Sequence, residues 1–371
     1  MKIGVIGAGA ISGIYLDNMV NKFENIEVAA IANRSMEKAR KKAEEFCIRA
    51  CTVGELLEDP DIEMVVNLTP VGAHYSLIKQ ALLAGKHVYT EKTLTDSTKS
   101  AKELLELADE KGLYLGSAPD TFLGSALQAA RSAVDGKLIG DIHSFAISAN
   151  RNNDILLSLF PFLRMPGAGV LFDYGVYYIT ALVSLLGPVG RVGGIVGTPY
   201  KTHVNILPES PEFGKVMDTP NESQVSAVIQ LKNGITGTLH MDNDSNMADE
   251  AYFAIYGTKG ILYLTDPNQF GGEVKYLPDC MDPGHPAEPV SLRKLTPYEE
   301  NSRGVGVSEM ADAIRSRRPH RASKEMAYHV LEVLEAILQC GENGRFMDIS
   351  SEFCMPKPLP QETQDDGKPK E

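Results

Sequence analysis

Three polar side chains have the types and the setting that proton transfer on a small oxygen-bearing substrate requires. Lys92 follows Glu91 directly after the short predicted strand 87–90, and Asp173 precedes Tyr177 by four residues in an apolar segment. A helix would place Asp173 and Tyr177 on one face, and a buried carboxylate is costly unless an arginine or a substrate hydroxyl partners it. A lysine in a crevice can donate to a substrate oxygen, or accept its proton if burial or a neighbouring cation lowers its pKa. The plain alternatives are a solvated lysine and a tyrosine that fills the core.

The N-terminal run MKIGVIGAGAISGI predicts a phosphate-binding turn between a strand and a helix. Gly7 permits a tight turn, Gly9 leaves room for a pyrophosphate beside the backbone, and the small Ser12 lets the helix pack closely. The amides of Ala10, Ile11 and their neighbours would then face the phosphates at a helix N-terminus. A purely structural turn is the alternative.

The end of the second predicted strand bears on the choice of dinucleotide. An acidic residue often stands there to hold the adenosine ribose diol, but this chain has Asn33, Arg34 and Ser35. No carboxylate repels a 2′-phosphate, and Arg34 can pair with one or stack on adenine. The pattern therefore favours NADP over NAD. If Asn33 bonds the diol and Arg34 only stacks, the protein uses NAD.

Two further turns follow predicted parallel strands, at the sheet edge where ligands bind in open α/β sheets. Asn67, Thr69 and Pro70 follow the first of these strands, and the rigid proline could brace the nicotinamide side of a cofactor. His74 is a candidate contact or simply begins a helix. Glu91 and Lys92 follow the next strand into the same crevice.

The elements that must position these residues divide the chain into two parts. Strands at 1–6, 26–32, 62–68, 87–90 and 113–117 alternate with helices at 10–22, 36–46, 74–84 and 97–112, which predicts a doubly wound parallel sheet over residues 1–120. Residues 121–355 contain helices at 124–135, 170–186 and 323–341 and strands at 141–150, 191–198, 223–232, 234–242, 250–256 and 260–265. The Asn233–Gly234 pair predicts a hairpin in an antiparallel sheet with one face solvated or covered by a partner. Residues 356–371 have no apolar period, so we expect a disordered tail.

Composition excludes several classes of protein. A net charge of −13 argues against nucleic-acid and anionic-membrane partners, and no apolar run approaches the ~20 residues of a membrane span. Four glycines within residues 4–13 do not fit a signal peptide, so we expect a cytoplasmic protein. The five cysteines are an odd number, so disulfides are not expected. Cys47 and Cys51 lack a matching His/Cys pair, so no metal site is predicted.

The order and spacing of these sites resemble the glucose–fructose oxidoreductase / inositol dehydrogenase / rhizopine catabolism (Gfo/Idh/MocA) family over roughly residues 1–350. Three motifs carry the resemblance: Gly7-Ala-Gly9-Ala-Ile-Ser12 for the family's GxGxx[GAS], Glu91-Lys92-Thr93 for Glu-Lys-Pro, and Gly167-Ala-Gly169-Val-Leu-Phe-Asp173-Tyr-Gly175-Val-Tyr177 for Gly-Gly-x-x-x-Asp-x-Gly-x-His. Residues 116–128, GSAPDTFLGSALQ, are also similar to one branch of bacterial sugar-type members. Asp120 lies there at about the place of an asparagine often found near the cofactor.

The resemblance implies an N-terminal Rossmann domain that binds NAD or NADP and a C-terminal domain built on a large, mostly antiparallel open sheet. The second domain forms the substrate site, and its outer face commonly builds homodimers or homotetramers. Members interconvert a secondary alcohol and a ketone on a sugar, cyclitol or similar polyol. The family lysine polarises the reacting oxygen, while the acid and histidine of the helix handle the proton and orient the substrate.

Two departures from the family pattern bear on the mechanism. Thr93 replaces a proline, so the loop loses a fixed φ and an easy cis bond, and Lys92 could be placed differently. Tyr177 replaces the histidine, and a phenol has a pKa near ~10 against ~6.5 for imidazole. Tyr177 is a good base only if a cation such as Lys92 lowers its pKa, in which case Asp173 would hold the substrate or the lysine.

The sequence therefore predicts an NAD(P)-dependent dehydrogenase that acts on a ring hydroxyl of a sugar, glycoside or cyclitol. Lys92, Asp173 and Tyr177 are its catalytic candidates, and Arg151, Asn153 and Arg164 join them as substrate-binding candidates from loops of the second domain. Two alternatives remain at this point. One is redox-neutral glycoside cleavage through transient oxidation, and the other is a cofactor-binding regulator without catalysis.

Overall fold

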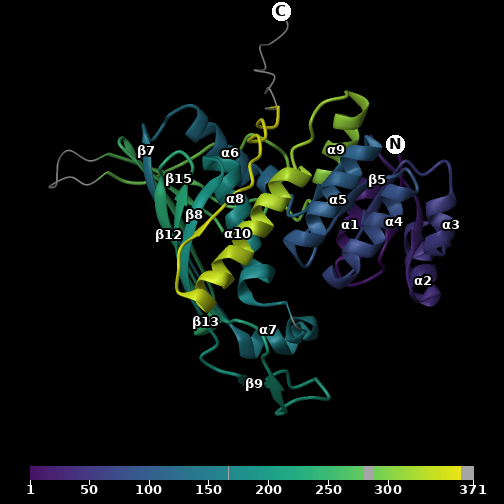
Figure 1. Cartoon of the computed structure of the whole chain (residues 1–371), viewed down its shortest axis with the longest axis horizontal. Coiled ribbons are helices and arrows are strands. Elements are labelled where there is room, and N and C mark those ends of the chain that lie inside the picture. The colour runs from purple at the N-terminus through teal and green to yellow at the C-terminus, as the bar shows by residue number, and fades with distance from the viewer. Residues whose placement is uncertain (166, 280–286, 361–371) are drawn as a thin grey trace, which may run out of the picture.

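The computed structural model describes residues 1–165, 167–279 and 287–360 (Figure 1). A six-stranded parallel sheet forms the N-terminal part, in the order β3-β2-β1-β4-β5-β6. Its strands are β1 Lys2–Ile6, β2 Glu27–Ala32, β3 Arg49–Cys51, β4 Met64–Asn67, β5 His87–Thr90 and β6 Leu115–Ser117. This is the order of a doubly wound dinucleotide-binding sheet, so the predicted fold class is confirmed. β1, β4 and β5 are buried along nearly their whole length, as a sheet covered on both faces requires.

The helices around this sheet are α1 Ser12–Asn21, α2 Met36–Phe46, α3 Val53–Glu58, α4 His74–Leu83 and α5 Thr98–Lys111. The ends of two of them carry ordinary capping residues. Ser35 caps α2 and Ser97 caps α5 with their hydroxyls, and Gly112 ends α5 in the left-handed region. The sequence analysis missed β3 and α3, because a three-residue strand is too short to show a period. The Thr52–Glu55 capping box was an available signal for α3.

The second sheet has nine strands in the order β16-β15-β14-β13-β7-β12-β11-β8-β17. They are β7 Ile142–Asn152, β8 Val189–Gly197, β11 Gln224–Leu231, β12 Thr236–Asp242, β13 Asp244–Gly257, β14 Gly260–Leu264, β15 Lys275–Pro278, β16 Val290–Ser291 and β17 Met347–Asp348. Only β7 and β12 pair in parallel, so this sheet is mixed and mostly antiparallel, as predicted. The hairpin between β11 and β12 turns at Gly234, whose φ of +91° suits glycine. A separate ribbon joins β9 Thr202–Val204 to β10 Val216–Asp218.

Helices cover one face of this sheet and connect it to the first one (Figure 1). They are α6 Ser125–Asp135, α8 Val176–Leu186 and α10 Lys324–Asn343, while α7 Asn153–Leu159 contacts β7 and β13, and α9 Val305–Arg315 packs beside β6 of the first sheet. Short 3₁₀ turns lie at Val71–Ala73, Thr121–Leu123 and Pro161–Arg164. The long α10 packs on α8 and β8 and also on α5 and β6, so it bridges both sheets. The two parts of the chain therefore share one continuous apolar core.

The helix predicted over 170–186 is not one regular α-helix. Leu171–Gly175 form a π-helical turn, and α8 begins only at Val176. Groups from distant segments hold this turn, because the Glu222 carboxylate accepts from the Leu171 amide and Lys92 donates to the Asp173 carbonyl. Hydrophobic periodicity cannot show such contacts, which is why the sequence indicated a plain helix.

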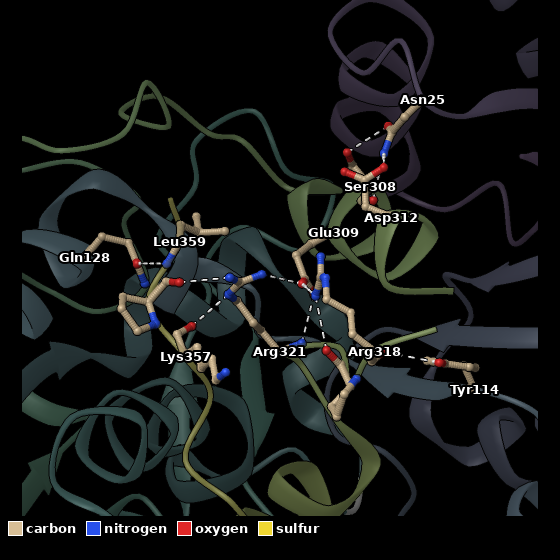
Figure 2. Close-up of polar contacts among 12 residues, drawn as sticks. Asn25, Tyr114, Gln128, Ser308, Glu309, Asp312, Arg318, Arg321, Lys357 and Leu359 are labelled. Atoms are coloured by element: carbon tan, nitrogen blue, oxygen red, sulfur yellow. Dashed lines mark hydrogen bonds and ion pairs between the residues drawn. The ribbon is translucent and has the colours of Figure 1, made fainter. Parts of the chain in front are cut away.

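Residues 356–359, the C-terminal strap, are fixed on the protein body (Figure 2). Arg131 donates to the Pro356 carbonyl, Arg321 donates to the carbonyls of Lys357 and Pro358, and the Leu359 amide donates to Gln128. Predicted disorder over 356–371 therefore does not hold for the strap, while residues 361–371 lie outside the described residues. Arg321 also pairs with the buried Glu309 of α9.

Candidate active site

The catalytic candidates meet where the carboxyl edge of the parallel sheet faces the second domain. β5 ends at Thr90 and places Lys92 just beyond it, whereas Asp173 lies in the π-helical turn and Tyr177 in the first turn of α8. The Lys92 and Asp173 side chains are 18% and 16% exposed, so a small molecule can still reach them. The fold thus joins residues that lie 81 positions apart in the chain.

Asp173 is held between two cations. Lys92 Nζ lies 2.9 Å from Asp173 Oδ1 and 2.7 Å from the Asp173 carbonyl, and Arg151 Nη1 lies 3.5 Å from Oδ2. Burial alone would raise the pKa of Asp173, but Lys92 and Arg151 together hold it below its usual value. Burial alone would lower the pKa of Lys92, but the charge of Asp173 and the oxygen of Tyr177 raise it above its usual value. Lys92 is therefore an ammonium at neutral pH.

Tyr177 lies beside the same lysine. Lys92 Nζ is 5.4 Å from the centroid of its ring, and Arg303 Nη2 is 3.4 Å from its hydroxyl. Burial raises the pKa of the Tyr177 phenol, and the opposing effects of Lys92 and Arg303 do not cancel that rise. The expectation that Lys92 makes the phenol a ready base is therefore corrected for the protein without ligand.

Glu91 positions the backbone that carries the lysine. Its carboxylate accepts from the Lys92 amide at 2.9 Å and from the Tyr15 hydroxyl at 2.7 Å, and Tyr15 belongs to α1. The peptide bond between Lys92 and Thr93 is cis, although Thr93 was expected to remove an easy cis bond. Lys92 reaches Asp173 with a threonine in this place.

The glycine loop has the features that a dinucleotide pyrophosphate requires. Gly7 has a φ of +115°, and a Cβ there would lie 2.7 Å from the backbone of Leu68, so only glycine fits. A Cβ on Gly9 would meet no atom within 4 Å, which leaves open space beside the backbone. Among the described residues, the amides of Gly9, Ala10 and Ile11 have no acceptor, and Ser12 closes the turn through a 2.7 Å bond to the Gly9 carbonyl. Free amides before α1 form an anion site, so these residues fit the cofactor.

Of the two residues after β2, Asn33 is held by hydrogen bonds and Arg34 is exposed to solvent. Asn33 Oδ1 accepts from the Ala8 amide at 3.2 Å, and its amide nitrogen donates to the Ser35 carbonyl, so Asn33 fixes the glycine loop. Arg34 is exposed and forms no ion pair within the described part of the chain. Its guanidinium is available to a ligand at this edge.

The predicted nicotinamide-side residues form a network of their own. Asn67 bonds both Thr90 and Thr69, while Pro70 is exposed at the start of the next turn. His74 is fully buried, and its ring nitrogens lie 2.8 Å from the carbonyls of Thr93 and Thr69. Burial lowers the pKa of His74. The ring thus holds two loops together and has no surface left for a ligand.

Three other predicted residues bond to partners other than Lys92 and Asp173. Asp120 is buried, accepts from the amides of Gly304 and Gly306 at 3.0 Å, and burial raises its pKa to about 6. Arg164 pairs with Glu212 at 3.1 Å, and Asn153 donates to Asp244 at 3.2 Å. Among the described residues, no cluster of three or more His, Cys, Asp and Glu could hold a metal, and no helix is long and apolar enough to cross a membrane.

The sequence analysis missed Arg303 and Tyr15, which contact the candidates directly. Arg303 lies 126 residues after Tyr177, in a loop with no motif or period. Tyr15 lies in an amphipathic helix, where the sequence pattern predicts that an aromatic residue packs in the hydrophobic core. Only the three-dimensional arrangement identifies them.

Comparisons with known proteins match both parts of the chain to one family. Residues 1–118 match the family described as "Oxidoreductase family, NAD-binding Rossmann fold", and residues 127–263 match the "GFO/IDH/MocA C-terminal domain". A dTDP-3,4-didehydro-2,6-dideoxy-alpha-D-glucose 3-reductase from Streptomyces violaceoruber is 37% identical over 204 residues, covering 53% of this chain and 57% of the relative. A scyllo-inositol 2-dehydrogenase (NADP(+)) from Bacillus subtilis is 24% identical over 50% of this chain and 52% of its own. The chain thus spans about half the length of these curated relatives.

A solved structure of levoglucosan dehydrogenase in complex with NADH shares the fold over nearly the whole chain. The TM-score is 0.81, the sequence identity is 18%, and the match covers 95% of this chain and 99% of the other. At this identity the likeness shows the fold alone.

Proposed function

Because the chain belongs to the Gfo/Idh/MocA oxidoreductase family, we propose that it transfers hydride between a nicotinamide dinucleotide and a secondary ring hydroxyl of a sugar, glycoside or cyclitol. The observation that carries this proposal is the Lys92–Asp173 pair, 2.9 Å apart at the carboxyl edge of the parallel sheet. Residues 1–120 would bind the dinucleotide and residues 121–355 the substrate. The named relatives that act on a deoxysugar and an inositol support this substrate class.

The residues of the pair divide the acid–base work. A nicotinamide dinucleotide held by the glycine loop of residues 7–12 would supply the hydride chemistry at the carbinol or ketone carbon. Lys92, as an ammonium, donates a hydrogen bond to the reacting oxygen and stabilises the negative charge that develops there. Asp173 and Arg151 keep the ammonium at the carboxyl edge of the sheet. Ketone reduction therefore begins with the proton already in place, whereas alcohol oxidation must first remove one from Lys92 or Tyr177.

We also propose NADP as the preferred dinucleotide. The support is Arg34, which is exposed and free of ion pairs in the part of the chain that the structure describes. A guanidinium forms charge-assisted hydrogen bonds with a phosphate that it cannot form with a ribose diol. Arg34→Ala should raise the dissociation constant of NADP by about 10-fold and leave that of NAD within about 2-fold. Arg40→Ala, which changes another exposed arginine on α2, is the matched control.

Self-association is proposed through the open face of the nine-stranded sheet. This face presents small and apolar side chains, including Ser226 and Val228 of β11 and Ile195 of β8, which is 77% exposed. A flat surface of this kind suits a second copy of the same sheet. Ile195→Glu should lower the mass measured by light scattering to that of a monomer, and an unchanged mass would refute the proposal.

The proposed activity is tested by following nicotinamide absorbance with purified protein. NADP and NAD are supplied separately with inositols, free sugars and glycosides, and Lys92→Ala is run beside the wild type. Reduction of one dinucleotide with one substrate class, lost in Lys92→Ala, supports the proposal. Cofactor binding without turnover of any of these compounds contradicts it.

A further inference from the structure

Arg303 reaches the site from outside every motif recognised in the sequence. It lies in the loop before α9, and its guanidinium is half-buried. Nη2 donates to Asn268 Oδ1 at 2.8 Å and to the Tyr177 hydroxyl at 3.4 Å, and Nη1 donates to Asn301 Oδ1 at 2.8 Å. The side-chain amide oxygens of Asn268 and Asn301 thus fix the Arg303 guanidinium that faces Tyr177.

This contact determines how Tyr177 can act. Arginine has donors only, so the Tyr177 oxygen accepts from Arg303 and its hydrogen must point elsewhere. Among the described residues, no acceptor for that hydrogen is found, and the nearby Lys92 is also a donor. Tyr177 is buried, with 7% of the residue exposed, so its free hydrogen cannot simply point into bulk water. The unpartnered hydroxyl is available for an acceptor on a ligand.

The first domain holds the backbone of Arg303. Asn18 of α1, fully buried, donates to the carbonyls of Asn301 and Arg303 at 2.8 and 2.9 Å. On the other side of the loop, the Gly304 amide donates to the buried Asp120 at 3.0 Å. Helix α1 also carries Tyr15, whose bond to Glu91 supports the Lys92 backbone. One helix, which begins at the glycine loop, thus supports both cations beside Tyr177.

We propose that Arg303 is a positioning residue, which fixes the Tyr177 hydroxyl as a hydrogen-bond donor to the reacting oxygen of the substrate. The inference rests on the proposed function. In ketone reduction, the substrate carbon gains the hydride of the reduced nicotinamide while the substrate oxygen gains the Tyr177 proton. The phenolate that remains is stabilised by Arg303 until solvent returns a proton.

The first test measures Tyr177 directly and requires no turnover. We place 3,5-difluorotyrosine at position 177 of the full chain and follow its ¹⁹F resonance against pH. The charged groups that face this phenol are Lys92, Arg303 and Glu91, and Tyr174 packs beside it at 6.5 Å between ring centroids. Arg303→Met should move the midpoint upward by about one pH unit, and Arg303→Lys by less, because it keeps the charge. Arg191→Met, at an exposed ion pair on β8, should not move it.

A second test separates positioning from a general structural role. Arg303→Met should lower kcat for ketone reduction by about 10- to 100-fold with an unchanged dissociation constant for the dinucleotide. In a Tyr177→Phe background the same change should cost less than about 3-fold, because Arg303 acts through the hydroxyl. An unmoved ¹⁹F midpoint in Arg303→Met, or additive losses in the double variant, would overturn the inference. If the wild type converts none of the substrates, the proposed function fails. The ¹⁹F midpoint still shows whether Arg303 acts on the Tyr177 hydroxyl.

Discussion

Replacing Asp173 with asparagine should disturb both the stability and the pH dependence of the protein. The change removes the carboxylate that lies 2.9 Å from Lys92 and 3.5 Å from Arg151, and it leaves two cations facing a neutral amide. Breaking a fully buried pair costs about 3–5 kcal/mol. The Asp173 and Lys92 side chains are still 16% and 18% exposed, so this pair is not fully buried. We therefore expect Asp173→Asn to lower the free energy of unfolding by about 2 kcal/mol.

The sign of the pH effect follows from the two pKa shifts. The folded protein raises the pKa of Lys92, so its contribution is present below about pH 10 and is lost as the pH rises through the folded value. The folded protein lowers the pKa of Asp173, so its contribution is present above about pH 4 and is lost as the pH falls through the folded value. At pH 7 both residues contribute fully to stability, so Asp173→Asn should cause its full loss of unfolding free energy at that pH.

Urea unfolding at pH 7 measures that loss. Asp135→Asn, which breaks a partly exposed pair with Arg131 on α6, is the control and should cost no more than about 0.5 kcal/mol. At about 1.4 kcal/mol per pKa unit, Asp173→Asn should also shift the alkaline rise of alcohol oxidation by one to two units toward lower pH. A loss no larger than that of the control, with an unmoved pH profile, would refute the assignment of Asp173 as the partner of a charged lysine.

Three other predictions concern the first domain and its contacts. Gly7→Ala should lower stability by about 1–3 kcal/mol and abolish cofactor binding, since its Cβ would meet the Leu68 backbone at 2.7 Å. Gly9→Ala should leave the thermal midpoint within about 2 °C and weaken dinucleotide binding at least about 10-fold, because its Cβ enters only open space; calorimetry separates the two. Burial raises the pKa of Asp120 to about 6, so stability should fall by roughly 1–3 kcal/mol as the pH rises from 4 to 6, and Asp120→Asn should flatten that slope in urea titrations.

Local signals were enough to predict the scaffold. The alternation of strands and helices in the first domain follows from local signals, among them the caps of α2 at Ser35 and of α5 at Ser97 and Gly112. The hairpin at Gly234 and the alternation of buried and exposed residues along β11 are local as well. Such signals can be read from the sequence because each of them depends only on residues within one turn or one strand.

The finer geometry of the site depends on distant parts of the chain. The π-helical turn at Asp173 is held by Glu222 and Lys92, and Tyr177 meets Arg303 from a loop with no pattern of its own. Burial of Tyr177, which raises its pKa, likewise depends on how the two domains pack. The resemblance of the motifs to the family predicted that Lys92 and Asp173 belong to one site, but not which charges surround the phenol.

Deuterium transfer tests the central claim most directly. A ketone substrate is reduced with NADPH that carries deuterium in place of both hydrogens at C4 of the nicotinamide, and the product is analysed by mass spectrometry. The account predicts an alcohol one mass unit heavier with the wild type, and a rate about 10²- to 10⁴-fold lower with Lys92→Ala at an unchanged dissociation constant for NADPH. Product without deuterium, or Lys92→Ala with the rate of the wild type, would contradict it.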